Sequence, residues 1–227
     1  SKSVSVSLSG DSGDELFGGY SRYTLANKIW SIIKFFPPII SNAVVLLLSS
    51  FEPKTYDRYY NYFSRLGILG NNINYKGDKV HKLSSIINSR SKHEFYDKFM
   101  SNWKLSENIV KGLDNSNSGI IYNRNSELID ISDFKTYMMS KDLTSYLPDD
   151  ILVKVDRAAM NVSLETRIPM LDYRIVEFST KLPMNMKIRN GISKWILRQV
   201  LYKYVPKALV EKPKKGFSVP VGLWLRG

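Results

Sequence analysis

The sequence contains no cysteine, which excludes a disulfide framework and thiolate chemistry. Only two histidines occur, His81 and His93, and their spacing is not that of a zinc site, so we expect surface or locally hydrogen-bonded side chains. The absence of cysteine fits a reducing compartment, and the start Ser-Lys-Ser-Val lacks the apolar stretch of a secretory signal. We therefore expect a cytoplasmic protein.

An apolar run long enough to cross a membrane is also lacking. Lys34 and the Pro37-Pro38 pair divide the most apolar region, residues 29–48, whereas a spanning helix needs about 20 consecutive apolar residues. Because proline breaks a helix interior, the region predicts two short buried helices. An interfacial segment is the weaker alternative, and no membrane partner is expected.

Acidic residues are scarce in the last third of the chain. Residues 151–227 contain 15 Lys and Arg against 5 Asp and Glu, in a chain of 227 residues with a net charge of +12. This imbalance favours a polyanionic partner, either ATP and pyrophosphate or a nucleic acid. A solvated basic face explains most of these lysines equally well. With 43% apolar residues, the chain can build a globular core.

The first twenty residues combine a strand pattern with an acidic, glycine-containing loop. Residues 4–8 alternate apolar side chains with serine, as in a strand with one apolar face. Asp11, Asp14 and Glu15 follow, and the apolar pattern returns at Leu16, so we expect strand, tight loop and helix. Backbone N–H groups of such a loop bind phosphate, and carboxylates beside it suit a shared Mg²⁺. A solvated turn whose carboxylates favour the helix dipole is the alternative.

A second informative stretch begins at Tyr146. Pro148, followed by two aspartates, is typical of a first helical turn, so the pattern predicts a helix that starts at residues 146–150. An apolar stripe along this helix should pack, and a polar stripe lies one residue earlier. The polar stripe is either a row of surface ion pairs or a surface that faces the acidic loop and its substrate. The stripes are Ile151, Val155, Ala158 and Val162, and Asp150, Lys154, Arg157 and Asn161.

The C-terminal part predicts two helices and a cationic loop. Asp172 caps a helix that Pro183 ends, and Ser193 caps another that Pro206 ends. Within residues 212–216, Pro213 and Gly216 then bracket Lys214 and Lys215, which gives a short loop with cationic tips. By itself such a loop would be a surface turn.

Together these segments resemble the asparagine synthetase (glutamine-hydrolysing) family. Ser9–Tyr20, SGDSGDELFGGY, is similar to the family signature SGDGGDELFGGY, with Ser12 in place of a glycine. Residues 146–172 closely resemble its long block YLPDDILVKVDRASM…SLEARVPFLD. Residues 212–227 resemble its RPKKGFGVP loop and the GxWLRG segment that follows, so the resemblance covers nearly the whole chain.

The resemblance implies an α/β fold, a Rossmann-like PP-loop ATPase domain similar to the ATP pyrophosphatases. Residues 4–20 would be its acidic strand–loop–helix nucleotide site and residues 21–227 a helical remainder. This stretch should therefore be mostly α-helical, with one N-terminal strand of the parallel sheet. The family's glutaminase domain, which starts with cysteine, and its SGG pyrophosphate loop do not occur in residues 1–227. We expect a partial synthetase domain that needs both missing segments and is inactive alone.

The resemblance also implies a reaction: ATP-dependent amidation of aspartate to asparagine through β-aspartyl-AMP, with ammonia from glutamine and with Mg²⁺. The implied site residues are Asp14 and Glu15 for Mg²⁺, Ser9 and Gly10 for the nucleotide, Asp11 as the base for the incoming amine, Lys214 on the leaving pyrophosphate, and Asp150 and Lys154 along the ATP cleft.

Two other functions stay open. One is an amidotransferase of the same fold that acts on another carboxylate, such as a uronic acid of a polysaccharide, because nucleotide-binding motifs do not distinguish the acceptor. The other is a basic helical module that binds nucleic acid, for which the acidic loop would be unusual. A homodimer is a further partner hypothesis.

Overall fold

The computed structural model describes residues 3–52, 54–56, 58–59, 76–101, 131–211 and 224–225. Lys214 and the rest of the cationic loop lie outside the described residues. The described part is mostly helical with a small parallel sheet, as expected. Its elements are β1 Val6–Leu8, α1 Gly13–Phe17, α2 Ser21–Ile33, α3 Pro38–Ser49, α5 Lys76–Ile87, α6 Lys92–Met100, α8 Phe134–Lys141, the π-helix η3 Asp142–Leu152, α9 Val153–Met160, β2 Glu165–Arg167, the 3₁₀ turn η4 Pro169–Leu171, α10 Tyr173–Lys181, α11 Met184–Lys187, α12 Trp195–Leu201 and α13 Lys207–Val210.

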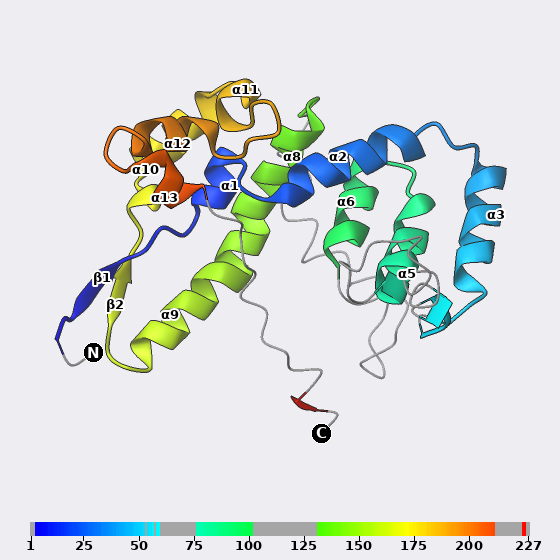
Figure 1. Cartoon of the computed structure of the whole chain (residues 1–227), viewed down its shortest axis with the longest axis horizontal. Helices are drawn as coiled ribbons and strands as arrows, with labels where there is room; N and C mark the ends of the chain where they lie inside the picture. Colours follow the sequence, from blue (N-terminus) through cyan, green and yellow to red (C-terminus); the bar gives the residue numbers. More distant parts are fainter. Residues whose placement is uncertain are drawn as a thin grey trace.

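One long helical segment, formed by α8, η3 and α9 and called the rod below, divides the molecule into two parts (Figure 1). Helices α2, α3, α5 and α6 form a helical group on one side of the rod, and the strands with α10 to α13 lie on the other side. Helix α1 lies between the sheet and the rod, and it contacts η3, α8, α10 and α12. The acidic loop that precedes α1 is therefore held where both parts of the molecule meet.

The sheet contains two strands in the described residues, whereas we expected one. Strand β1 runs parallel to β2, with Val6 opposite Glu165 and Leu8 opposite Arg167. Three-residue strands of this composition carry no alternating pattern, so β2 was not visible in the sequence. The expected strand at residues 4–8 is confirmed in its core, Val6–Leu8.

The rod is one continuous helical segment from α8 through η3 to α9. The prediction that a helix starts near Pro148 is wrong, because Pro148 lies inside η3. Proline cannot donate a backbone hydrogen bond, and a π-helical stretch is one way to accommodate such a residue within a helix. The rod begins instead at Asp133, whose Oδ2 accepts a hydrogen bond from the Thr136 backbone N–H at 2.9 Å.

The hydrophobic core lies between α2, α5, α6 and α8. It is rich in aromatic rings, and Phe95 and Phe134 have centroids 5.9 Å apart. Burying such rings contributes strongly to stability, because each one removes a large apolar area from water. The buried core residues are Tyr23, Ala26, Ile33, Ile86, Ile87, Phe95, Tyr96, Phe134, Tyr137, Met138 and Met139.

Two packing predictions are wrong. Helix α3 was expected to be buried, but Ile39 is 83% exposed and Leu46 is 73% exposed. The apolar stripe of α9 was expected to pack, but Ala158 and Val162 are exposed. Apolar side chains on both helices therefore stay exposed among the described residues.

Among these residues, no helix is both long and apolar enough to span a bilayer.

The C-terminal helices follow the sequence except at both ends of α12, which ends at Leu201 and not at Pro206. Asp172 caps α10 as predicted, since its Oδ1 accepts a hydrogen bond from the Arg174 backbone N–H at 2.9 Å. Helix α12 is not capped by Ser193. Its N-cap is Lys194, which has a left-handed backbone with φ of 52°.

Candidate functional site

The acidic loop Ser9–Ser12 joins the carboxyl end of β1 to the start of α1. The Ser9 backbone N–H donates to the Arg167 carbonyl at 2.9 Å, so the loop begins where the strand pair ends. Ligands of open α/β sheets bind at this edge. Ser12 is buried and left-handed, with φ of 64°, a conformation that glycine adopts more easily. This explains the glycine at this place in the signature that the sequence resembles.

Ser9 and Asp11 are joined directly, because the Ser9 hydroxyl donates a hydrogen bond to Asp11 Oδ2. The loop thus brings together two of the predicted site residues. Gly10 between them is exposed, and no heavy atom lies within 4 Å of the position that a Cβ would occupy. The loop surface at Gly10 is therefore open to a ligand.

Asp14 points to a partner that the sequence analysis missed. Its Oδ1 lies 2.9 Å from Nζ of Lys194, at the start of α12, and the two side chains are 33% and 27% exposed. Gly19 leaves room for this ion pair, since a Cβ there would lie 1.7 Å from Asp14 Oδ1. The Gly19 backbone N–H also donates to the Asp14 carbonyl at 2.8 Å. No local spacing links Asp14 to Lys194, so only the fold reveals the pair.

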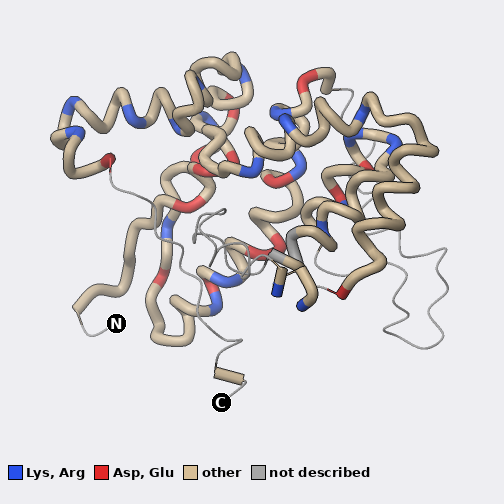
Figure 2. The backbone as a smooth tube through the Cα atoms, turned by 45° about the vertical axis from the view of Figure 1, so that its right-hand side comes forward, with Lys and Arg blue, Asp and Glu red and all other residues tan. Residues whose placement is uncertain are grey.

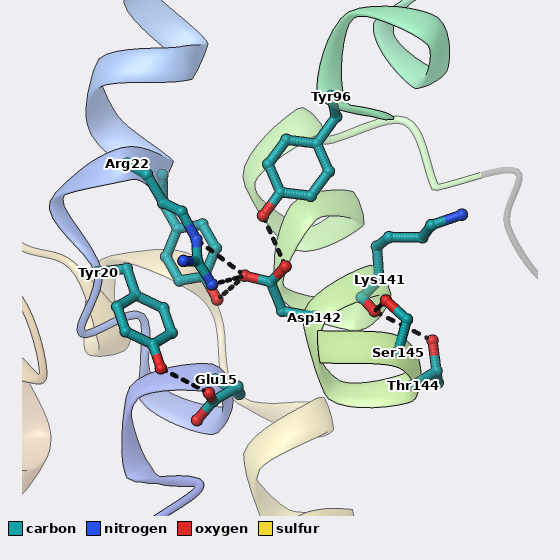
Figure 3. A network of polar contacts seen from close by, with 9 residues as sticks. Glu15, Tyr20, Arg22, Tyr96, Lys141, Asp142, Thr144 and Ser145 are labelled. Atoms are coloured by element: carbon teal, nitrogen blue, oxygen red, sulfur yellow. Dashed lines mark hydrogen bonds and ion pairs between the residues drawn. The ribbon is translucent and has the colours of Figure 1, made fainter. Parts of the chain in front are cut away.

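Glu15 has a different environment from Asp14. It is 2% exposed, and its Oε1 accepts a hydrogen bond from the Tyr20 hydroxyl at 2.7 Å (Figure 3). Burial raises the pKa of Glu15, and the hydrogen bond from Tyr20 offsets part of this rise. Glu15 therefore accepts a hydrogen bond from Tyr20, whereas Asp14 forms an ion pair with Lys194.

A buried carboxylate, Asp142, connects the site to the core (Figure 3). It is 1% exposed and accepts hydrogen bonds from Arg22 Nη2 at 2.6 Å and from the hydroxyls of Tyr23 and Tyr96, each at 2.7 Å. Burial lowers the pKa of Arg22, but the charge of Asp142, its hydrogen bond and the neighbouring tyrosines together outweigh burial and hold this pKa above its usual value. The sequence analysis did not single out any of these residues.

Arg22 also stacks on the tyrosine that holds Glu15. Its guanidinium carbon lies 3.9 Å from the centroid of the Tyr20 ring and 4.6 Å from that of Tyr146. Cation–π contacts of this kind are favourable when partly desolvated. A chain of contacts therefore runs from Glu15 through Tyr20 and Arg22 to Asp142, and it ties α1 to the rod.

The first two members of the predicted polar stripe, Asp150 and Lys154, pair with each other. Asp150 Oδ1 and Lys154 Nζ lie 3.8 Å apart across one helical turn, and both side chains are more than half exposed. Arg157 and Asn161 are exposed on the same helix. These contacts do not test the expected role of Asp150 and Lys154 along an ATP cleft, which stays a prediction.

Residues at the C-terminal end of α12 contact Glu211, the residue before the cationic loop. Arg198 Nη1 lies 2.7 Å from Glu211 Oε1, and the Tyr202 hydroxyl donates to the same oxygen. Glu211 directly precedes the segment with Lys214, which lies outside the described residues. Helix α12 thus contacts α1 through Lys194 at its start and the residue before the cationic loop near its end. Figure 2 shows Lys and Arg spread along the described chain, with Asp and Glu between them.

Comparisons with known proteins agree with the resemblance. The family model described as asparagine synthase matches residues 1–227. Asparagine synthetase (glutamine-hydrolysing) 1 of Bacillus subtilis is 29% identical over 234 residues, which is 99% of this chain and 32% of the relative. The asparagine synthetases of Gallus gallus and Homo sapiens are 32% and 31% identical over 111 residues, which is 48% of this chain and 19% of each relative.

No solved structure gives a significant match. The chain spans about a third or less of the length of these curated relatives. Since the family model covers the whole chain, this protein belongs to the asparagine synthase family.

Proposed function

We propose that this chain is the ATP-using part of a glutamine-dependent asparagine synthetase. The observation that carries the proposal is the acidic loop at the carboxyl end of β1, where the Ser9 hydroxyl donates to Asp11 and Asp14 follows in the first turn of α1. In the proposed reaction the side-chain carboxylate of aspartate attacks the α-phosphorus of ATP and pyrophosphate leaves. Ammonia from glutamine then attacks the acyl carbon, and AMP leaves.

The donor set of the loop fits Mg²⁺. This ion is usually bound by one or two carboxylates together with substrate phosphates. Asp14 Oδ1 is a buried oxygen that accepts no hydrogen bond among the described residues, and its partner is the charged Lys194. We assign Mg²⁺ to Asp14. Glu15, which faces Tyr20, would assist by holding α1 in place. Bound Mg²⁺ neutralises phosphate charge during adenylation.

The remaining roles follow from chemistry and the family resemblance. The Ser9 hydroxyl and the Gly10 backbone would hold the nucleotide, since the space around Gly10 is open. Asp11 would take a proton from the attacking amine. Lys214 would offset the charge on the leaving pyrophosphate, and Asp150 and Lys154 would line the cleft. A homodimer and a cytoplasmic location stay predictions.

The experiment is exchange of labelled pyrophosphate into ATP by the full-length protein, with aspartate or with a uronic acid as the acceptor. Aspartate-dependent exchange is the expected result, because reversible formation of an acyl adenylate returns label to ATP. Exchange that depends on the uronic acid would indicate instead an amidotransferase that acts on this other carboxylate. No exchange with either acid, in protein that binds ATP, would contradict adenylation at this site.

A further inference from the structure

Lys194 approaches the first turn of α1 from a distant part of the chain. Its Nζ lies 2.9 Å from Asp14 Oδ1, although its own backbone sits at the N-cap of α12 with φ of 52°. A left-handed backbone is uncommon for a residue that is not glycine, and it is maintained only where the surroundings determine it. The fold thus keeps a strained lysine in place beside this one carboxylate.

The glycines of the loop leave space for the same pair. A Cβ on Gly19 would lie 1.7 Å from Asp14 Oδ1 and 2.3 Å from Lys194 Cε. A Cβ on Gly13 would lie 3.7 Å from Lys194 Nζ, in ordinary contact. The pair thus occupies the space that a side chain on Gly19 would take.

Lys194 and a metal ion would compete for one oxygen. Mg²⁺ binds oxygen at about 2.0–2.1 Å and carries two positive charges, so it repels an ammonium that contacts the same oxygen. Lysine suits this exchange because it carries a point charge on a flexible stem. Asp14 Oδ1 accepts no hydrogen bond among the described residues, so the ammonium is the group that the metal would replace.

We propose that Lys194 is the resident counter-ion of Asp14, which Mg²⁺ displaces when it arrives with the nucleotide. The proposal rests on the function proposed above. Without a ligand, the ammonium offsets one of the carboxylate charges of the loop. Mg²⁺ alone then binds weakly, because it must displace Lys194 without the help of phosphate oxygens. Lys194 is a positioning residue that favours loading of metal and nucleotide together.

The experiment titrates Mg²⁺ into the full-length protein by calorimetry, first without nucleotide. Lys194→Met keeps the aliphatic stem and removes the charge. We expect it to bind Mg²⁺ alone roughly fivefold more tightly than the unmodified protein, on the scale of one partly exposed ion pair. Lys181→Met is the matched control, since Lys181 pairs with Glu177 at 3.0 Å on α10, and its Mg²⁺ affinity should be unchanged.

A double variant locates the effect. Asp14→Asn combined with Lys194→Met should lose the gain, because the competing oxygen has been neutralised. Equal Mg²⁺ affinity in Lys194→Met and the unmodified protein would overturn the proposal, as would a gain that persists in the double variant. If Lys194→Met does not fold, Lys194→Gln provides the same comparison. Failure of the proposed function would appear separately, as no aspartate-dependent pyrophosphate exchange in the unmodified protein.

Discussion

Arg22 on α2 donates from Nε and Nη2 to the same carboxylate oxygen of Asp142, at 3.1 and 2.6 Å, in a place where Asp142 is almost inaccessible to water. The pair joins α2 to the rod. Tyr20, which holds Glu15, stacks on the same guanidinium. Site geometry and core stability therefore depend on one buried charge.

Asp142→Asn should strongly destabilise the fold, because it leaves the Arg22 charge without its partner. Breaking a buried ion pair by removing one member costs about 3–5 kcal/mol. Urea unfolding followed by circular dichroism measures the loss. Asp150→Asn is the control, since its exposed pair with Lys154 should contribute at most about 1 kcal/mol. Similar losses for both variants would show that the Asp142 cluster does not support the core.

Gly19→Ala should disrupt the Asp14–Lys194 pair, because the new methyl group would overlap both side chains. Both are flexible, partly exposed side chains that can move aside, so the expected loss is that of one such ion pair, at most about 1 kcal/mol. Gly10→Ala is the matched control for stability, since a Cβ at Gly10 meets open space. Thermal melts compare the two, and an undisturbed melting temperature in Gly19→Ala would contradict the close approach.

Stability should depend on pH through Glu15, whose pKa is raised by burial above its ordinary 4.5. A group with a raised folded-state pKa contributes stability below its unfolded pKa and loses it as the pH rises through the folded pKa. The free energy of unfolding should therefore fall as the pH rises from 4.5 through the raised pKa. Glu15→Gln should flatten this part of the profile, and an unchanged profile would exclude Glu15 as its source.

The sequence predicted the elements that local patterns encode and missed those made by distant contacts. The strand at Val6–Leu8 and the acidic loop follow from alternation and glycine spacing. Strand β2 depends on pairing with β1, and the partner of Asp14 depends on where α12 packs, so neither leaves a local signal. Pro148 gave a wrong helix start because a π-helical stretch can contain a proline that the first-turn rule places at an end.

Lys214→Ala in the full-length protein should reduce adenylation by on the order of 10²–10³, as expected for loss of a positioned electrostatic group. Lys212→Ala and Lys215→Ala should stay near the unmodified rate, because screened surface lysines contribute little. Pyrophosphate release measures all three, with thermal melts as the folding control. Equal small effects would make the segment a basic surface turn.

The most direct test of the account compares Asp14→Asn and Asp11→Asn in aspartate-dependent exchange of pyrophosphate into ATP by the full-length protein. If Asp14 holds Mg²⁺, Asp14→Asn abolishes exchange, whereas Asp11→Asn retains exchange and loses mainly the ammonia-dependent formation of the amide. Exchange at the unmodified rate in Asp14→Asn would contradict the metal assignment and with it the proposed role of the acidic loop.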